Sequence, residues 1–216
     1  MHKATLGKAE TTLLAPFRAL TLECIITPVS RQEFAAATAE IFAAGVAGFD
    51  TESKPLFNNG EISDGPHVVQ FALQDKAFIF QLNRPECRLP LIELLQSSVV
   101  LKAGFGLESD RAHLHRTLGV KLASVLDLNH VFRRDGYGAS TGVRAAVAIV
   151  LNQKFHKSKR VTTSNWAAAE LSDKQLIYAA NDAYAALQVL LVLERQREDL
   201  PISGLIPGDE NNGASD

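Results

Sequence analysis

The sequence predicts a single α/β domain, and three observations lead to this fold class. The chain has 216 residues, a length typical of one domain with a substantial core. Hydrophobic residues make up 46% of it, which argues against a disordered chain. Short apolar runs typical of strands come first, and longer helical patterns dominate later. The domain is expected to span residues 21–200, between an N-terminal arm at 1–20 and a polar tail at 201–216 that should be disordered.

The first half of the chain is predicted to hold most of the strands. Residues 1–20 are interpreted as a loosely attached arm. Ser30 and Glu33 form a capping box, so a helix is expected to follow and to end at Gly45. Residues 57–66 are rich in turn-forming residues and are expected to be a loop. Strands are expected at residues 22–29, 46–49, 67–73 and 77–82, the last two as a hairpin.

The second half of the chain is predicted to be mainly helical. Ser172 and Gln175 form a second capping box, so a long helix is expected to follow. Asp127 lies near the start of another expected helix, where capping is a more common role than catalysis. A short buried strand is expected at residues 99–101. Helices are expected at residues 89–96, 107–118, 124–133, 141–151 and 173–195.

Two acidic side chains, Asp50 and Glu52, follow the strand predicted at residues 46–49. Because side chains two apart on a strand point to the same face, these two are expected to lie side by side, with Thr51 facing away. Carboxylates that close repel each other unless a cation lies between them or one is protonated. Their oxygens suit hard ions such as Mg²⁺ or Mn²⁺. A D-x-E motif without further motifs is more often a solvated acidic strand end, and that alternative stays open here.

Three further polar side chains, Asp110, Tyr178 and Asp182, lie in predicted helices. Asp110 is expected in the first turn of a helix that follows a glycine-containing turn, where the helix dipole favours an acid in any case. Tyr178 and Asp182 are four residues apart in the last predicted helix and therefore share a face. The alanines around them would let another element approach that face closely. Each position also fits an ordinary structural role.

Taken in order, the D-x-E at residues 50–52, Asp110 and the Y-x-x-x-D at 178–182 resemble the motifs of the DEDD superfamily of 3′→5′ exonucleases. The resemblance is closest to the tyrosine branch, which contains RNase D, the Werner-syndrome exonuclease domain and the proofreading domain of family A DNA polymerases. The histidine branch would need His one residue earlier, where Ile177 stands. The resemblance extends over about residues 20–197. It implies a ribonuclease H-like fold, in which helices flank a mixed central sheet.

The resemblance also implies an activity and a set of roles. The chain would be a 3′-5′ exonuclease that uses two divalent cations, Mg²⁺ or Mn²⁺, and releases nucleoside 5′-monophosphates. Asp50, Glu52 and Asp182 would hold the first ion, and Asp50 would also contact a second ion that Asp110 helps to hold. Tyr178 would orient the attacking water. The alternative is a catalytically weak nucleic-acid-binding module of the same fold, whose mark would be a broken carboxylate set; this set is intact.

The charge distribution points to a local basic surface. The net charge of the chain is −2, so no global basic field is present. Residues 133–160 nevertheless contain seven basic residues and one acid, directly before the last predicted helix. We expect Lys157, Lys159 and Arg160 to contact phosphates there, although a charge run is often only a solvated face. The expected partner is a single-stranded 3′ end of DNA or RNA, and no protein partner is indicated.

Several other classes of protein are disfavoured by the sequence. Cys24 and Cys87 are isolated, so neither a zinc site nor a disulfide framework is indicated. The longest unbroken apolar run, residues 145–151, is far too short to span a bilayer. Residues 1–8 lack the apolar core of a secretory signal. A cytoplasmic protein with no membrane contact is therefore expected.

Overall fold

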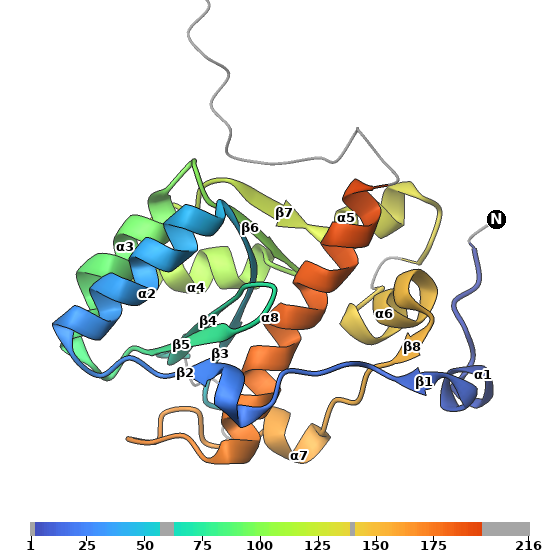
Figure 1. Ribbon diagram of the computed structural model, residues 1–216, viewed down its shortest axis with the longest axis horizontal. Helices are drawn as coiled ribbons and strands as arrows, with labels where there is room; N and C mark the ends of the chain where they lie inside the picture. Colours follow the sequence, from blue (N-terminus) through green and yellow to red (C-terminus); the bar gives the residue numbers. More distant parts are fainter. Residues whose placement is uncertain (1–2, 57–62, 139–140, 196–216) are drawn as a thin grey trace, which may run out of the picture.

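A six-stranded mixed sheet lies at the centre of the protein in the computed structural model, which describes residues 3–56, 63–138 and 141–195 (Figure 1). The strand order is β2-β5-β4-β3-β6-β7. Strands β3, β6 and β7 are parallel, whereas β4 is antiparallel to both β3 and β5, and β2 is parallel to β5. The strands are β2 (Ile25–Ile26), β3 (Val46–Glu52), β4 (Val68–Ala72), β5 (Ala77–Gln81), β6 (Leu101–Gly104) and β7 (Val125–Asp127).

Helices cover both faces of this sheet. Buried side chains of α2, α3 and α4 pack on one face, and those of α5, α6 and α8 pack on the other. The helices are α1 (Lys8–Leu13), α2 (Arg31–Ala44), α3 (Arg88–Gln96), α4 (Glu108–Leu118), α5 (Leu128–Arg134), α6 (Val143–Leu151), α7 (Lys159–Thr162) and α8 (Asp173–Glu194). Short 3-10 turns, η1 (Leu22–Cys24) and η2 (Pro85–Cys87), and a small parallel pair, β1 (Ala15–Pro16) with β8 (Gln153–Lys154), complete the fold.

Helix α8 crosses the centre of the sheet and packs against β3 (Figure 1). Gly48 permits this close approach, because a Cβ at position 48 would overlap the backbone carbonyl of Ala183. By length and mean hydropathy α8 could cross a membrane, but 67% of its most apolar window is buried inside the domain, as expected of a core helix. The tight packing at Gly48 has a consequence for the site, since it brings the residues that follow in β3 next to α8.

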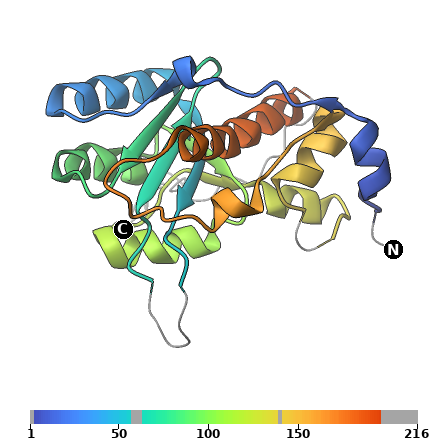
Figure 2. The same cartoon turned by 90° about the horizontal axis from the view of Figure 1, so that it is seen from below.

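The N-terminal segment lies along the domain. Figure 2 shows α1 beside α6, at the opposite end of the molecule from α2 and α3. Phe17 is 9% exposed and packs edge-on against Phe155, with ring centroids 5.2 Å apart. The backbone N–H of Leu20 donates to Asn181 Oδ1 over 2.7 Å, and Asn181 Nδ2 donates back to the Leu20 carbonyl over 3.0 Å. The segment interpreted as a loose arm is therefore attached to α8 through Asn181, to β8 through the backbone pairing of β1, and to Phe155 through Phe17.

Several predicted elements are confirmed. The helix that follows Ser30 is α2, and Gly45 ends it in the left-handed conformation with φ +69°. The predicted hairpin is β4 with β5. The capping box of Ser172 and Gln175 precedes α8, as expected. Residues 57–62 of the expected loop and the whole expected tail at 201–216 lie outside the described residues.

Three boundaries predicted from the sequence are wrong. The expected helix at 124–133 begins as strand β7, because Val125 and Leu126 are fully buried beside β6, and short apolar runs do not distinguish a strand from a helix. The strand expected at 99–101 lies at β6 instead, and Val99 is 72% exposed. The strand expected at 22–29 shrinks to β2, since η1 precedes it.

Candidate active site

Three carboxylates meet where β3 packs against α8. One oxygen each of Asp50, Glu52 and Asp182 lies within 4.8 Å of the others. The alternation of side chains along β3 puts Asp50 and Glu52 on the same face as Gly48, the face that α8 covers. The close contact at Gly48 therefore places Asp182 against both. The structure brings together the three residues that the sequence predicted as ligands of one ion.

Glu52 and Asp182 are buried and Asp50 is half-buried, and burial raises the pKa values of all three. Glu52 is 9% exposed and Asp182 is 4% exposed. Burial, together with the charges of Asp182 and Asp110, raises the pKa of Asp50 well above its usual value. Burial and the neighbouring Asp50 raise the pKa of Glu52 to about 10. Without a cation, the cluster therefore tends to retain protons at neutral pH.

The cluster fits a hard divalent cation. Asp182 is compensated on one side only, because its Oδ2 lies 2.6 Å from Lys157 Nζ, whereas its Oδ1 has no partner within the part of the chain that the structure describes. Buried polar atoms normally have partners, so a carboxylate with one bare oxygen beside two other carboxylates is costly unless a ligand compensates it. Three carboxylate oxygens are the donors that Mg²⁺ and Mn²⁺ prefer. A cation held by Asp50, Glu52 and Asp182 would satisfy all three groups at once.

Lys157 contributes a positive charge to this cluster. Its Nζ lies 2.6 Å from Asp182 Oδ2 and 5.3 Å from the centroid of the Tyr178 ring. Burial opposes this charge, but Asp182 and Asp50 outweigh burial and raise the pKa of Lys157. Lys157 was predicted to contact phosphates, and its ammonium group is here paired with a carboxylate. Lys159 and Arg160, predicted with it, lie exposed on α7.

Tyr178 lies one helical turn before Asp182, as the sequence predicted. The side chain is 8% exposed and packs on Trp166, with ring centroids 5.9 Å apart. Its hydroxyl forms a hydrogen bond of 2.8 Å with the hydroxyl of Thr162. Burial and the nearby Asp182 raise the pKa of Tyr178 to about 12, so the phenol stays protonated at neutral pH. Such a phenol can orient a polar group but is a poor base.

Asp110 is near the cluster but is not one of its three members. It lies in the first turn of α4 and accepts a hydrogen bond from the hydroxyl of Thr51. Burial raises the pKa of Asp110, and this hydrogen bond opposes the effect of burial. Thr51 faces away from Asp50 along β3, as predicted, but its pairing with Asp110 was not predicted. A contact between residues so far apart in the chain leaves no local pattern.

Asp127 fixes the turn that leads to Asp110. Its carboxylate accepts hydrogen bonds from the backbone N–H groups of Gly106 at 3.0 Å, Leu107 at 2.8 Å and Asn129 at 2.9 Å. The predicted capping role is thus confirmed for α5. The same carboxylate also holds the turn between β6 and α4, where Gly106 has φ +71°. This second role was not predicted, although it determines where α4 begins.

A small cavity of about 180 Å³ opens beside the carboxylates. Asp50 and Asp182 line it, together with Lys157 and the first residues of α6. A larger cavity of about 490 Å³ lies beyond it, next to Tyr178 and Asp182, and its walls include the apolar side chains of Phe17 and Ile177. Both cavities therefore adjoin the carboxylate of Asp182 in α8.

Comparisons with known proteins show the family of this chain. A protein-family model described as "3′-5′ exonuclease" matches residues 26–198, the range that holds every predicted site residue. The chain is 31% identical over 169 residues to the bifunctional 3′-5′ exonuclease/ATP-dependent helicase WRN of Mus musculus. It is 30% identical over 165 residues to a 3′-5′ exonuclease of Arabidopsis thaliana. These alignments cover 77% and 73% of this chain, but they span 12% and 55% of the two relatives.

Solved structures share the fold. The EXO domain of Aedes aegypti Nibbler superposes with a TM-score of 0.70 at 23% identity, over 84% of this chain and 91% of that domain. The RNase D of Trypanosoma brucei, in a complex with RNA U12, superposes with a TM-score of 0.70 at 20% identity, over 83% of this chain and 65% of that one. The predicted fold, a mixed central sheet flanked by helices in one domain, is confirmed.

Proposed function

The chain belongs to the 3′-5′ exonuclease family, and we propose that it removes nucleotides from the 3′ end of a nucleic acid strand with the help of two divalent cations. The observation that carries this proposal is the meeting of Asp50 and Glu52 with Asp182 inside the family-matched range. Buried carboxylates at this spacing are costly unless they hold a cation. We place the chain in the tyrosine branch because Tyr178 precedes Asp182 by one helical turn.

Each carboxylate has a defined part in this proposal. Asp50, Glu52 and Asp182 would hold the first ion, and Asp50 with Asp110 would contribute to the second. When bound, Mg²⁺ or Mn²⁺ would neutralise the phosphodiester and lower the pKa of a bound water. Thr51 would orient the Asp110 carboxylate, since its hydroxyl donates to that group. The intact set of acids favours a working enzyme over a module that only binds nucleic acid.

Tyr178 would position the water that attacks the phosphorus. The phenol is protonated at neutral pH, because its pKa is raised to about 12. It can therefore donate a hydrogen bond, and Thr162 keeps the hydroxyl in place. The water oxygen bonds to phosphorus, and the bond from phosphorus to the 3′ oxygen of the preceding nucleotide breaks. The attacking water gives up one proton to solvent, the 3′ oxygen takes one proton from solvent, and the last nucleotide leaves with a 5′ phosphate.

The substrate proposed is a single-stranded 3′ end. The small cavity beside Asp50 is about 180 Å³, a volume that suits one phosphodiester group better than a paired duplex end. The RNase D neighbour was solved in a complex with RNA, and the mouse relative is named as a helicase as well as an exonuclease, so both RNA and DNA are considered as the polymer. We propose that one of these two polymers is the natural substrate.

A digestion experiment tests the function. Purified protein is incubated with 5′-labelled single-stranded DNA and RNA of one sequence, with Mg²⁺, with Mn²⁺ or with EDTA. We expect a ladder that shortens from the 3′ end, nucleoside 5′-monophosphates as the released products, and no cleavage in EDTA. Matched duplexes with blunt and recessed 3′ ends show the strand preference. Intact substrates in both metals would contradict the proposal, and so would release of nucleoside 3′-monophosphates.

A further inference from the structure

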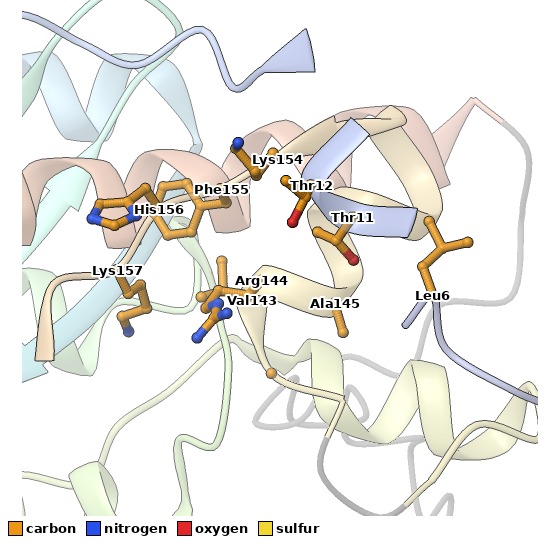
Figure 3. Close-up of a pocket in the computed structure, with 11 residues that line it drawn as sticks. Leu6, Thr11, Thr12, Val143, Arg144, Ala145, Lys154, Phe155, His156 and Lys157 are labelled. Atoms are coloured by element: carbon orange, nitrogen blue, oxygen red, sulfur yellow. The ribbon is translucent and has the colours of Figure 1, made fainter. Parts of the chain in front are cut away.

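A cavity of about 720 Å³ lies between the N-terminal segment and the start of α6 (Figure 3). Its walls come from three parts of the chain: the N-terminal residues Leu6, Thr11 and Thr12, residues 142–145, and residues 154–157. The hydrolysis proposed above does not use this cavity. It nevertheless adjoins the carboxylates, because Gly142, Val143 and Lys157 line both this cavity and the small cavity beside Asp50 and Asp182.

The lining of this cavity is basic. Arg144, Lys154 and Lys157 contribute cationic side chains, His156 contributes an imidazole, and no acidic residue is among the lining residues. Lys157 is paired with Asp182, whereas Arg144 and Lys154 form no ion pair in the described part of the chain. Figure 3 shows Arg144 extending from the start of α6 toward the side of the cavity where Lys157 lies. A chain of net charge −2 thus concentrates uncompensated positive charge beside its carboxylate cluster.

The backbone at this wall adds to the same charge preference. Helix α6 begins at Val143, and Gly142 supplies no side-chain cap. The N–H groups of Ala145 and Ala146 donate to the Gly142 carbonyl, whereas those of Val143 and Arg144 make no hydrogen bond within the described residues. Free N–H groups at a helix start favour an anion. This effect supports the cationic side chains and would not define a site without them.

We propose that this cavity binds a phosphate group of a nucleotide, with Arg144 as its main contact. A strand whose 3′-terminal phosphodiester lies at the carboxylates must continue into a neighbouring space. The cavity of about 490 Å³ is lined by apolar Phe17 and Ile177 and suits a base, whereas the basic cavity suits the backbone. A planar guanidinium matches the oxygens of a phosphate with two parallel hydrogen bonds. The proposal rests on the exonuclease function proposed above.

The N-terminal wall of this cavity precedes the part of the chain that the family model matches. The family model matches residues 26–198, so Leu6, Thr11 and Thr12 lie before the matched range. The wall is held in place by the pairing of β1 with β8 and by Phe17 against Phe155. The phosphate could belong to the uncut strand or to the released nucleotide, and the experiment separates these two sources.

The test compares wild type, Arg144→Gln, Arg144→Lys and the control Arg31→Gln, which alters an exposed arginine of α2. Single strands of two to eight nucleotides are digested in Mg²⁺, and octanucleotide binding is measured in EDTA across a salt series. If the phosphate belongs to the strand, Arg144→Gln raises KM about tenfold for octanucleotides. The ratio of this KM to that of wild type grows with strand length. The plot of log affinity against log salt becomes flatter by about 0.7 in slope. Arg144→Lys restores the wild-type slope, and Arg31→Gln resembles wild type.

Inhibition by a nucleoside 5′-monophosphate gives the second arm. A higher inhibition constant in Arg144→Gln, with no dependence on strand length, would assign the phosphate to the released nucleotide. Unchanged salt slopes, length profiles and inhibition constants in Arg144→Gln would overturn the proposal. The salt series in EDTA reports on Arg144 even if the wild type cleaves no strand, so failure of the cavity proposal and failure of the exonuclease function are distinguishable.

Discussion

Two buried charges among the described residues, Lys102 and Asp182, are treated by the fold in opposite ways. Lys102 in β6 is fully buried, and its Nζ donates to the carbonyl oxygens of Leu94 at 3.0 Å, Ser97 at 2.9 Å and Val100 at 2.7 Å. Asp182 is 4% exposed, and within the described chain one of its oxygens pairs with Lys157 while the other has no partner. One buried charge is fully partnered by the backbone, and the other faces two more carboxylates.

The difference separates a structural charge from a functional one. An ammonium group has three donors, and all three of Lys102 are used at the end of α3, where a helix leaves carbonyls without partners. The hydrogen bonds of Lys102 are therefore satisfied within the fold, and its charge needs no ligand. The carboxylates repel one another and remain incomplete without a cation. Buried groups that the fold leaves unsatisfied are the ones on which a ligand can act.

Asp50→Asn should produce the largest effect. It removes a charge from the cluster, so we expect cleavage of single strands in Mg²⁺ to fall to background. The same change relieves repulsion, so the metal-free protein should unfold at an equal or higher temperature than wild type. Activity and thermal unfolding in EDTA are measured on one preparation. Wild-type turnover by the variant would place Asp50 outside the reaction, and a large loss of stability would make it a structural residue like Lys102.

Tyr178→Phe should reduce the rate without changing the carboxylates. The ring keeps its packing on Trp166, and only the hydroxyl that contacts Thr162 is lost. We expect kcat to fall on the order of 10²-fold, with metal and strand affinities close to wild type. Tyr184→Phe, on the same helix, is the matched control. A loss of metal affinity, or an unchanged kcat, would show that Tyr178 does not position the water.

The pH dependence of stability should have opposite signs at the two buried charges. The pKa of Glu52 is about 10 in the folded, metal-free protein and about 4.3 when unfolded, so the folded state binds more protons between these values. Its contribution to the free energy of unfolding is therefore lost as pH rises toward 10. Burial lowers the pKa of Lys102 to about 8, from about 10.4, so its contribution grows with pH between these values.

Denaturant unfolding in EDTA between pH 6 and pH 10 measures both contributions. Glu52→Gln should flatten the fall of stability with pH, and Lys102→Met should remove the rise above about pH 8. Saturating Mg²⁺ should reduce the fall for wild type and change little for Glu52→Gln. The comparison breaks if Glu52→Gln keeps the wild-type pH profile, because the cluster would then retain no protons.

The same contrast explains how far the sequence could predict the site. Asp50, Glu52 and Tyr178 with Asp182 could be placed because strand and helix periodicity fix their directions within one element. Contacts between elements could not be placed that way. Thr51 with Asp110 and Lys157 with Asp182 join residues on different elements, and only the packed fold brings them together.

The fold was predictable to the same degree. Capping boxes and a hairpin turn are local, and they located α2, α8 and the β4–β5 pair. Residues 125–127 form a strand only because β6 lies beside them. The short pair β1 with β8 depends on a contact between the chain start and residues after α6, and nothing in either segment indicates it.

Lys159→Ala should produce the smallest effect, and it sharpens the comparison within the basic stretch. From the sequence alone, Lys157 and Lys159 count equally, and loss of both should lower the salt slope of single-strand binding by roughly 1.4. In the structure Lys157 is paired with Asp182, while Lys159 is exposed on α7. A cation already paired with a carboxylate releases few counterions when a strand binds, so Lys157 should contribute little to the slope in EDTA.

We therefore expect Lys159→Ala to flatten the slope of log affinity against log salt by about 0.7 in EDTA. The double variant with Lys157→Ala should flatten it by the same amount. Binding should weaken about equally for strands of different sequence, because phosphate contacts carry no base information. Lys121→Ala, an exposed lysine after α4, is the control. A fall of about 1.4 in the double variant would mean that a bound strand frees Lys157 from Asp182. An unchanged slope in Lys159→Ala would leave α7 as a solvated face, and the strand would then reach the carboxylates by way of Arg144.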